Sequence, residues 1–237
     1  ALHNLIKKTT FSCSTDETRP IFCGCYLEIA ENLITMAATN THRLSVKKET
    51  FPEAIGNAKA IVPAKSLNEL LHILNPDDPG EVRISLDDNY ISFTARNIYF
   101  TSRLIEGSYP EYQKVIPKSF ALRAVINVED LSAAIDRLSL ISRAGEYNTI
   151  NLHFEDSELH MYTNTPDIGR AEEAVPAEIE GEPLSISFNA AYISDALKNL
   201  DTEKCIISLN RSLDPAAIRE DNDSSFIYIV TPVRTGT

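Results

Sequence analysis

The cysteines are the side chains of this sequence best suited to nucleophilic, redox or soft-metal chemistry. They stand at positions 13, 23, 25 and 205. Cys23 and Cys25 are separated by one residue, whereas zinc and redox motifs usually place two residues between their cysteines. On a strand, both side chains would face the same side. We interpret the cysteines as buried, reduced thiols.

The histidines form no metal-binding motif of the H-E-x-x-H type. They stand at positions 3, 42, 72, 153 and 160. His153 and His160 bracket a predicted β-hairpin and could meet across it, which leaves a weak alternative of metal binding there. We predict no metal site and no cofactor.

Paired carboxylates, the groups of general acid–base catalysis, occur at 87–88, 155–156, 172–173 and 221 with 223. Nearly all fall in predicted turns or helix starts, and adjacent strand residues point to opposite faces. There is no G-x-S-x-G motif, and the eight glycines are too scattered for a dinucleotide-binding or phosphate-binding loop. We therefore identify no catalytic residues, and no motif in the sequence supports an enzyme activity.

The charge is acidic and unevenly distributed. The 237 residues include 22 Lys and Arg against 34 Asp and Glu, a net charge of −12. Residues 1–117 carry a net of −2 and residues 118–237 a net of −10. Such a chain does not attract nucleic acid through its overall field, so any DNA contact must be local, weak or topological. No apolar run is long enough for a membrane span, and we expect a cytoplasmic protein.

Four apolar stripes with helical spacing predict helices that begin near Leu2, Leu67, Leu131 and Tyr192. The second pair of stripes repeats the first pair. The tripeptide at 39–41, Thr-Asn-Thr, also recurs at 163–165. Asn127 and Asn189 stand where helix N-caps are expected. The chain is therefore an internal repeat.

Alternating segments at 82–95 and 152–161 predict β-hairpins that turn at 87–89 and 155–157. Strands that follow one another predict an α+β fold, with two helices per domain packed on antiparallel β-sheets. We place two tandem domains at residues 1–117 and 118–237. The junction is predicted at 115–118, because Pro117 favours an extended residue before it.

Four segments combine apolar, aromatic and basic residues where loops or strand ends are predicted: 39–44, 106–117, 188–192 and 228–234. One interpretation is packing between the domains. The other is a groove beside the domain junction for a short apolar peptide, rimmed by Arg43 and Arg234.

These four segments resemble the bacterial DNA polymerase III beta sliding clamp. The chain reads T-N-T-H-R-L, G-S-Y-P-E-Y-Q-K-V-I-P, F-N-A-A-Y-I-S-D-A-L and Y-I-V-T-P-V-R, where the family has T-D-G-H-R-L, G-x-(F/Y)-P-(D/E)-Y-x-x-V-(I/L)-P, F-N-x-x-Y-(L/V)-x-D-(A/V)-L and Y-x-V-M-P-M-R. The matches keep their order over the full 237 residues. The family has three such domains, and the resemblance covers the second and third, with the N-terminal domain absent.

The resemblance implies two similar clamp domains in a processivity factor, which encircles duplex DNA as a homodimeric ring and tethers other proteins without chemistry or sequence reading. Implied partners are the DNA polymerase III catalytic subunit, the clamp loader, translesion polymerases, mismatch-repair proteins and ligase. Without the first domain, we expect a monomer or a weak contact that does not form a ring. The cations predicted to face DNA from polar helix faces are Lys7, Lys8, Lys65, Arg137 and Lys198.

The resemblance also implies a cleft that takes a partner motif similar to Gln-Leu-x-Leu-Phe. Apolar walls would take the Leu and Phe side chains, and Asn189 and the arginines would bind polar groups. The matching positions are Phe22, Thr39, Thr41, His42, Arg43, Leu44, Pro117, Tyr147, Asn189, Tyr192, Leu213, Pro215, Thr231, Pro232, Val233 and Arg234.

Two departures from the family pattern bear on this cleft. Asn40-Thr41 replaces Asp-Gly, and threonine does not easily adopt a positive φ, so we expect either a different loop bend or a narrower cleft. Thr231 and Val233 replace two flexible methionines, which predicts a stiffer pocket with an altered peptide preference.

Two alternatives to a clamp remain open at this point. The first is a scaffold of the same fold that does not act on DNA. The second is a hydrolase that uses the carboxylate-rich C-terminal half.

Overall fold

The computed structural model of the protein describes residues 1–77 and 80–234. The chain divides into two compact units, residues 1–113 and 114–237. The junction predicted at 115–118 lies slightly further along the chain, and the exact domain limits stay a prediction.

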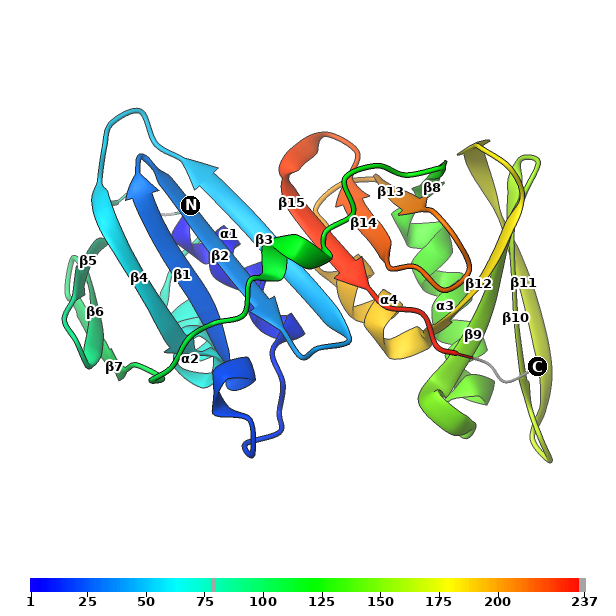
Figure 1. The fold of residues 1–237 in the computed structure, drawn as a ribbon, viewed down its shortest axis with the longest axis horizontal. Coiled ribbons are helices and arrows are strands. Elements are labelled where there is room, and N and C mark those ends of the chain that lie inside the picture. Colours follow the sequence, from blue (N-terminus) through cyan, green and yellow to red (C-terminus); the bar gives the residue numbers. More distant parts are fainter. Residues whose placement is uncertain (78–79, 235–237) are drawn as a thin grey trace. The chain divides into compact units, whose positions relative to one another are not determined.

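The first unit contains two antiparallel sheets, with strand orders β3-β2-β1-β4 and β5-β6-β7. Two helices pack against each other and cover one face of the larger sheet (Figure 1). The elements are α1 Leu2–Lys7, β1 Gly24–Glu31, β2 Leu33–Thr39, β3 Arg43–Thr50, β4 Gly56–Pro63, α2 Ala64–Ile73, β5 Arg83–Leu86, β6 Tyr90–Ala95 and β7 Ile98–Arg103, with 3₁₀ turns η1 Thr10–Ser12, η2 Pro20–Cys23 and η3 Tyr112–Val115.

The core of the first unit lies between the helices and the larger sheet. Leu5 of α1, Leu67 and Leu70 of α2 and Met36 of β2 have no exposed surface. The helical spacing of these leucines points them all to one face, so burial of that face stabilises helices that are too short to persist alone.

The second unit is one antiparallel sheet of order β12-β9-β10-β11-β8-β13-β14-β15. It curves around two helices that pack on each other (Figure 1). The elements are β8 Leu122–Asn127, α3 Val128–Ser142, β9 Thr149–Glu155, β10 Glu158–Thr165, β11 Gly169–Glu180, β12 Leu184–Asn189, α4 Ala190–Lys198, β13 Lys204–Leu209, β14 Ala216–Glu220 and β15 Asp223–Val230, with the 3₁₀ turn η4 Glu146–Asn148.

The predicted α+β class and all four predicted helices are confirmed. Both hairpins are also confirmed, because β5 pairs with β6 and β9 pairs with β10. Asn127 Oδ1 accepts a hydrogen bond from the Asp130 N–H at 3.0 Å, and Asn189 Oδ1 accepts one from the Ala191 N–H at 2.9 Å. These bonds cap α3 and α4 as predicted.

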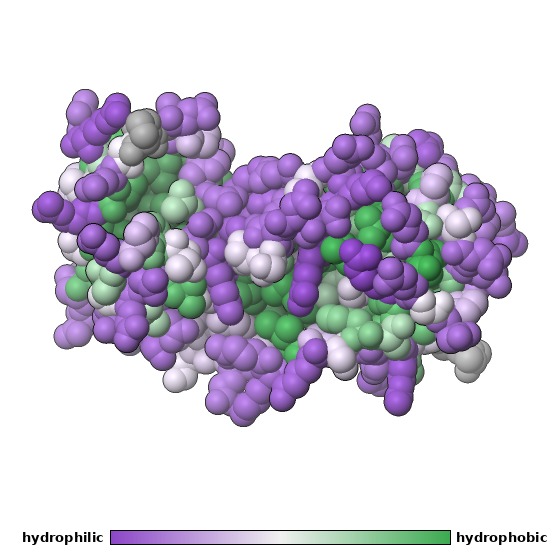
Figure 2. Space-filling model, turned by 90° about the horizontal axis from the view of Figure 1, so that it is seen from above, coloured by the Kyte–Doolittle hydropathy of each residue, from purple (hydrophilic) through white to green (hydrophobic). Residues whose placement is uncertain are grey.

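Polar residues cover much of the face of each unit that Figure 2 shows, and apolar surface is gathered in smaller patches between them. Of the helices in the described ranges, none combines the length and apolarity needed to cross a membrane.

Candidate functional site

In the first unit, the turn at 39–44 runs from the last residue of β2 to the first two residues of β3. Its residues other than Asn40 belong to the predicted site. The Thr39 hydroxyl donates to the Arg43 carbonyl at 2.6 Å and accepts from the Thr41 N–H at 3.0 Å. Asn40 Oδ1 accepts from the N–H groups of His42 and Arg43 at 3.0 and 3.1 Å. The Thr-Asn pair therefore builds the turn itself, as short polar side chains do at such positions.

Thr41 adopts the left-handed conformation, with a φ of 79°. This is the conformation that glycine favours and that is strained for a β-branched residue. The turn therefore has a positive φ with threonine in it. Both expectations for this departure, a different bend and a narrower cleft, stay predictions. The exposed Thr41 side chain adds volume at the turn.

Tyr109 supports this turn from the segment that follows β7. Its hydroxyl accepts a hydrogen bond from the Thr39 N–H at 3.1 Å, and its ring stacks on Tyr26 at 5.4 Å. Burial raises the pKa of Tyr109 far above its usual range. Tyr112 lies 6.1 Å from the ring of Tyr26, and burial raises its pKa to about 12. Both hydroxyls are therefore neutral hydrogen-bonding groups at physiological pH.

Arg43 is held within the first unit. Its Nη2 atom donates to the Phe11 carbonyl at 2.6 Å, and its guanidinium lies 5.9 Å from the centre of the Phe11 ring. Arg43 therefore has a structural role beside its predicted role at the rim of the groove, because it attaches β3 to the segment after α1. Leu44 is buried, Thr39 is half-buried, and His42 is exposed.

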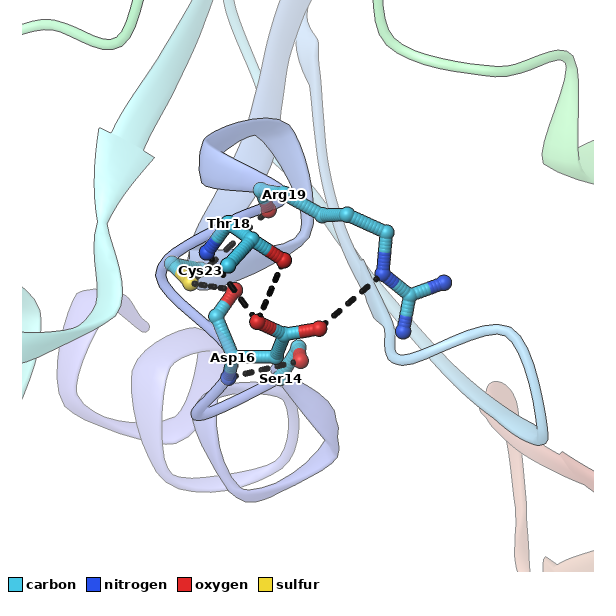
Figure 3. Close-up of polar contacts among 5 residues, drawn as sticks. All are labelled: Ser14, Asp16, Thr18, Arg19 and Cys23. Carbon is cyan, nitrogen blue, oxygen red and sulfur yellow. Dashed lines mark hydrogen bonds and ion pairs between the residues drawn. The ribbon is translucent and has the colours of Figure 1, made fainter.

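Phe22 lies in η2 and is half-buried. The Arg19 guanidinium lies 5.4 Å from the centre of its ring. The turn before it is ordered by Asp16, whose Oδ1 accepts from the N–H and hydroxyl of Thr18 at 3.0 and 2.6 Å. These bonds from Thr18 hold the pKa of Asp16 below its usual range. Figure 3 shows this arrangement.

The second unit holds a pocket of about 550 Å³, a volume within the usual range for ligand sites. Three predicted site residues, Tyr147, Val233 and Arg234, belong to its lining. The other lining residues are Ser142, Ala144, Gly145, Glu146, Thr149, Asn151, Asn164, Thr165 and Pro166.

The wall of this pocket is shaped by the turn after α3. The Ser142 hydroxyl donates to Asn148 Oδ1 at 2.5 Å, which closes the turn. Tyr147 has a φ of 57° and is 65% exposed. A Cβ on Gly145 would lie 3.0 Å from the Thr165 hydroxyl oxygen, so the close approach of the turn to β10 favours glycine.

Hydrogen bonds attach the C-terminal segment 228–234 to α4 and to β12. The Tyr228 hydroxyl is buried and donates to the Tyr192 carbonyl of α4 at 2.8 Å. The Val233 N–H donates to the Ser187 carbonyl of β12 at 2.8 Å. These two bonds place Val233 and Arg234 beside the pocket.

The remaining predicted site residues of the second unit lie outside the lining of this pocket. Leu213 is 64% exposed, in the connection before β14. The half-buried residues are Pro117, Asn189, Tyr192, Pro215, Thr231 and Pro232. Asn189 uses its amide oxygen to cap α4, which fixes the orientation of the side chain.

The cations predicted to face DNA fall into different environments. Lys65 and Lys198 are exposed and form no ion pair with any described residue. Lys7 is half-buried. Arg137 binds Glu173 through Nε and Nη2 at 2.7 and 2.9 Å, which balances its charge. The prediction is wrong for Lys8 as an exposed helix residue, because Lys8 caps the end of α1 and is only 1% exposed.

The weak metal site is not supported by the geometry. His153 and His160 are opposite each other across β9 and β10, as expected. However, each imidazole contacts the carboxylate of a glutamate on its own strand, Glu155 at 3.1 Å and Glu158 at 3.2 Å. Within residues 1–77 and 80–234, no group of three or more ligating side chains could hold a metal ion.

The cysteine prediction is correct in part. All four thiols are free, and Cys13, Cys25 and Cys205 are buried. Cys23 is half-buried and ends η2, while Cys25 lies in β1. Cys23 therefore lies outside the strand, and the condition under which Cys23 and Cys25 would face the same side is not met.

Sequence reasoning missed several residues that build the site. Phe11 and Tyr26 act through contacts with residues far along the chain, which no local pattern indicates. The buried Ser142 bonds to Asn148 within the turn after α3 and was not singled out either. Tyr109 lies in the segment 106–117, which the sequence analysis singled out. The sequence did not predict its hydrogen bond to the Thr39 N–H.

Comparison with models of known protein families assigns both parts of the chain to one family. Residues 1–111 match the central domain of the DNA polymerase III beta subunit, and residues 113–234 match its C-terminal domain. The chain belongs to the DNA polymerase III beta subunit family.

Individual relatives agree with this assignment. The beta sliding clamp of Bacillus subtilis is 37% identical over 238 residues, which cover 99% of this chain and 62% of that protein. The beta sliding clamp of Staphylococcus epidermidis is 35% identical over 235 residues, with 99% and 62% covered. The chain therefore spans about three fifths of the length of these relatives.

Solved structures share the fold. The crystal structure of the DNA polymerase sliding clamp from Bacillus subtilis matches with a TM-score of 0.93 at 36% identity, over 99% of this chain and 62% of that one. The beta chain from Streptococcus pneumoniae matches with a TM-score of 0.94 at 34% identity, over 99% and 63%.

Proposed function

We propose that the protein is a DNA sliding clamp, a non-catalytic processivity factor that tethers DNA polymerase III and other DNA-processing proteins to duplex DNA. Membership in the beta subunit family carries this proposal. The acidic net charge agrees with it, because a topological tether needs few phosphate contacts and firm binding would hinder sliding. The ring of two full-length chains, the cytoplasmic location and the individual partners belong to the same proposal.

The proposed tethering site binds a short peptide motif of the partner, similar to Gln-Leu-x-Leu-Phe. The support is the pocket of the second unit, which contains Tyr147, Val233 and Arg234 of the predicted set. The turn at 39–44 of the first unit joins the proposal through its motif, T-N-T-H-R-L. Arg234 is exposed, and the Asn189 NH₂ group is free to donate, so both suit polar groups of the peptide.

Fluorescence polarisation of a labelled Gln-Leu-Ser-Leu-Phe peptide tests the proposal. We expect a Kd of roughly 0.1–10 μM, which corresponds to about −7 to −10 kcal/mol. The double variant Pro232→Ala with Arg234→Ala should weaken binding at least about tenfold, because it removes an apolar wall and a polar anchor. Pro76→Ala with Arg83→Ala changes the same residue types at exposed positions outside the site and should leave the Kd unchanged.

The absence of measurable binding by the well-folded chain would contradict the proposed peptide site. The departure at 231 and 233 is tested in the same assay. The variant Thr231→Met with Val233→Met should change the affinity for the standard peptide, because two flexible apolar side chains replace stiff ones. Equal affinities would contradict the predicted change in preference.

A further inference from the structure

Two buried thiols of the first unit lie in contact. The Sγ atoms of Cys13 and Cys25 are 3.6 Å apart. Cys13 follows η1 and is 9% exposed, and Cys25 lies in β1 with no exposed surface. A disulfide requires about 2.05 Å between the sulfur atoms, so an approach of roughly 1.5 Å would join them.

The segment between the two cysteines is already closed at its base. The Ser14 N–H donates to the Phe22 carbonyl at 2.8 Å, which holds the two ends of the segment together. The Asp16 turn organises the tip. The ends are thus pre-arranged for a crosslink, and little chain entropy remains to be lost when it forms.

Cys23 makes contacts of its own with the turn that Asp16 organises. Its Sγ contacts the carbonyl oxygens of Asp16 at 3.3 Å and Arg19 at 3.8 Å, as Figure 3 shows for the turn. The sulfur atom in contact with Cys25 is therefore that of Cys13. Cys23 is more exposed and closer to Cys25 in sequence, yet its Sγ contacts carbonyl oxygens.

We propose that Cys13 and Cys25 form an oxidisable dithiol site, which a hydroperoxide such as hydrogen peroxide converts into an intramolecular disulfide. The Cys13 thiolate attacks the peroxide, the O–O bond breaks, and Cys13 sulfenic acid and hydroxide form. The Cys25 thiol then attacks the Cys13 sulfur, the S–O bond breaks, and water leaves as the S–S bond forms. In sum, two thiols are oxidised, one peroxide is reduced, and two waters are released.

The environment makes this site slow to react but stable once formed. The contact with Cys25, together with burial, raises the pKa of Cys13 well above its usual range. Little thiolate is present at neutral pH, so we expect oxidation only under sustained peroxide. Burial also shields the product from reducing thiols.

The crosslink would act on the turn proposed to bind peptide, and this consequence rests on the proposed function. The Phe11 carbonyl holds Arg43, and the Ser12 and Ser45 hydroxyl oxygens are 2.6 Å apart. Both contacts immediately precede Cys13 in the chain. Movement of Cys13 toward Cys25 would therefore shift Phe11 and Ser12 relative to β3. Because these residues hold β3 at the turn, we expect a several-fold loss of peptide affinity that a reductant reverses.

The experiment treats the whole chain with hydrogen peroxide, blocks remaining thiols and maps cysteine pairing by mass spectrometry. We expect a loss of two hydrogens, a crosslinked Cys13–Cys25 peptide, and alkylated Cys23 and Cys205. Cys23→Ala, the matched control, should form the same crosslink. Cys25→Ala should form none. The oxidised wild type should unfold several degrees higher than the reduced protein.

A crosslink that includes Cys23, or sulfinic acid at Cys13 without a crosslink, would overturn the inference. Because the mapping uses the wild type, it decides the matter even if Cys25→Ala fails to fold. The peptide assay separates the two proposals. Binding by the reduced chain without a crosslink after peroxide contradicts only the dithiol site. A crosslink in a chain that never binds peptide contradicts only the proposed peptide site.

Discussion

Thr41 occupies the position at which the motif of the beta clamp family, T-D-G-H-R-L, has glycine. Its φ is 79°. A left-handed conformation costs a non-glycine residue about 1–2 kcal/mol, and glycine gives back part of that through its larger unfolded-state entropy. We predict that Thr41→Gly raises the free energy of unfolding by about 0.5–1 kcal/mol. Urea unfolding of the two proteins measures the difference.

Thr50→Gly is the matched control for this prediction. Thr50 is exposed at the end of β3 and does not have a positive φ. The same chemical change should therefore destabilise the protein there, since glycine weakens a strand. Stabilisation by both substitutions, or by neither, would show that strain at Thr41 does not contribute.

Tyr109 is predicted to stabilise the turn at 39–44 through its hydroxyl. Tyr109→Phe leaves the Thr39 N–H without its acceptor and should cost about 1–2 kcal/mol of unfolding free energy. Tyr90→Phe removes an exposed hydroxyl from β6 and should change stability by less than about 0.5 kcal/mol. Equal effects of the two substitutions in denaturant unfolding would contradict the role given to the Thr39 bond.

At the residue scale, sequence patterns identified the type of a group better than its partner. Arg43 was predicted as a binding cation, yet it also holds the Phe11 carbonyl. Lys8 was predicted on a polar helix face, yet it is buried where the six-residue α1 ends. Both outcomes depend on neighbours from other elements, and helical periodicity carries no information about those neighbours.

At the element scale, the repeat predicted the order and type of the elements but not their extent. The first helix of the repeat has six residues in α1 and fifteen in α3. The Thr9 hydroxyl donates to the Leu5 carbonyl at 2.7 Å just after α1, in competition with the helix backbone. In α3 the apolar stripe continues without such an interruption. Equal spacing of apolar residues therefore did not imply equal helices.

The Thr-Asn-Thr repeat shows the same divergence. Thr39 ends β2 and builds a turn, whereas Thr163 and Thr165 remain within β10 and are buried. The Thr163 hydroxyl donates to the Thr149 carbonyl at 2.9 Å, and Thr165 donates to Ile141 at 3.1 Å. The tripeptide suits both settings because threonine favours strands and its hydroxyl bonds nearby backbone.

The caps of α3 and α4 allow the structural and binding roles of asparagine to be separated. Asn127→Ala and Asn189→Ala should each cost about 1 kcal/mol, because each removes an N-cap. Asn189→Asp keeps the cap oxygen, so stability should stay within about 0.5 kcal/mol of the wild type. It removes the NH₂ donors, however, and should weaken peptide binding several-fold.

Asn127→Asp provides the control, since Asn127 caps a helix but is not among the predicted site residues. It should leave both stability and the peptide Kd unchanged. Thermal unfolding and fluorescence polarisation of the four variants test the assignment. Unchanged affinity in Asn189→Asp would remove Asn189 from the proposed site.

At the scale of the whole molecule, the α+β class followed from strands that succeed one another and helices that carry apolar stripes. The pocket of the second unit could not be predicted in the same way. Its lining comes from the turn after α3, from β9, from the end of β10 and from the C-terminal segment. These segments meet only through the sheet order β12-β9-β10-β11, which the strand pattern does not determine.

The charge of the whole chain leads to a last prediction, on DNA. With a net charge of −12, contact with duplex DNA must come from a few local cations. Lys65 and Lys198 are the predicted ones that remain exposed without a described ion pair. We expect weak binding whose logarithm falls with the logarithm of salt concentration, and Lys65→Ala with Lys198→Ala should make that slope shallower by about 1.8.

Fluorescence anisotropy of a labelled duplex between about 20 and 100 mM salt measures this slope. The control is Lys59→Ala with Lys204→Ala, which removes two exposed lysines that are 2.9 Å from Glu28 and Glu178. Those lysines already have carboxylate partners on strands and release no counterions from DNA, so the control should retain the original slope. An equal change of slope in both variants would mean that DNA binding depends only on the net charge of the protein. Lys65 and Lys198 would then not contact DNA.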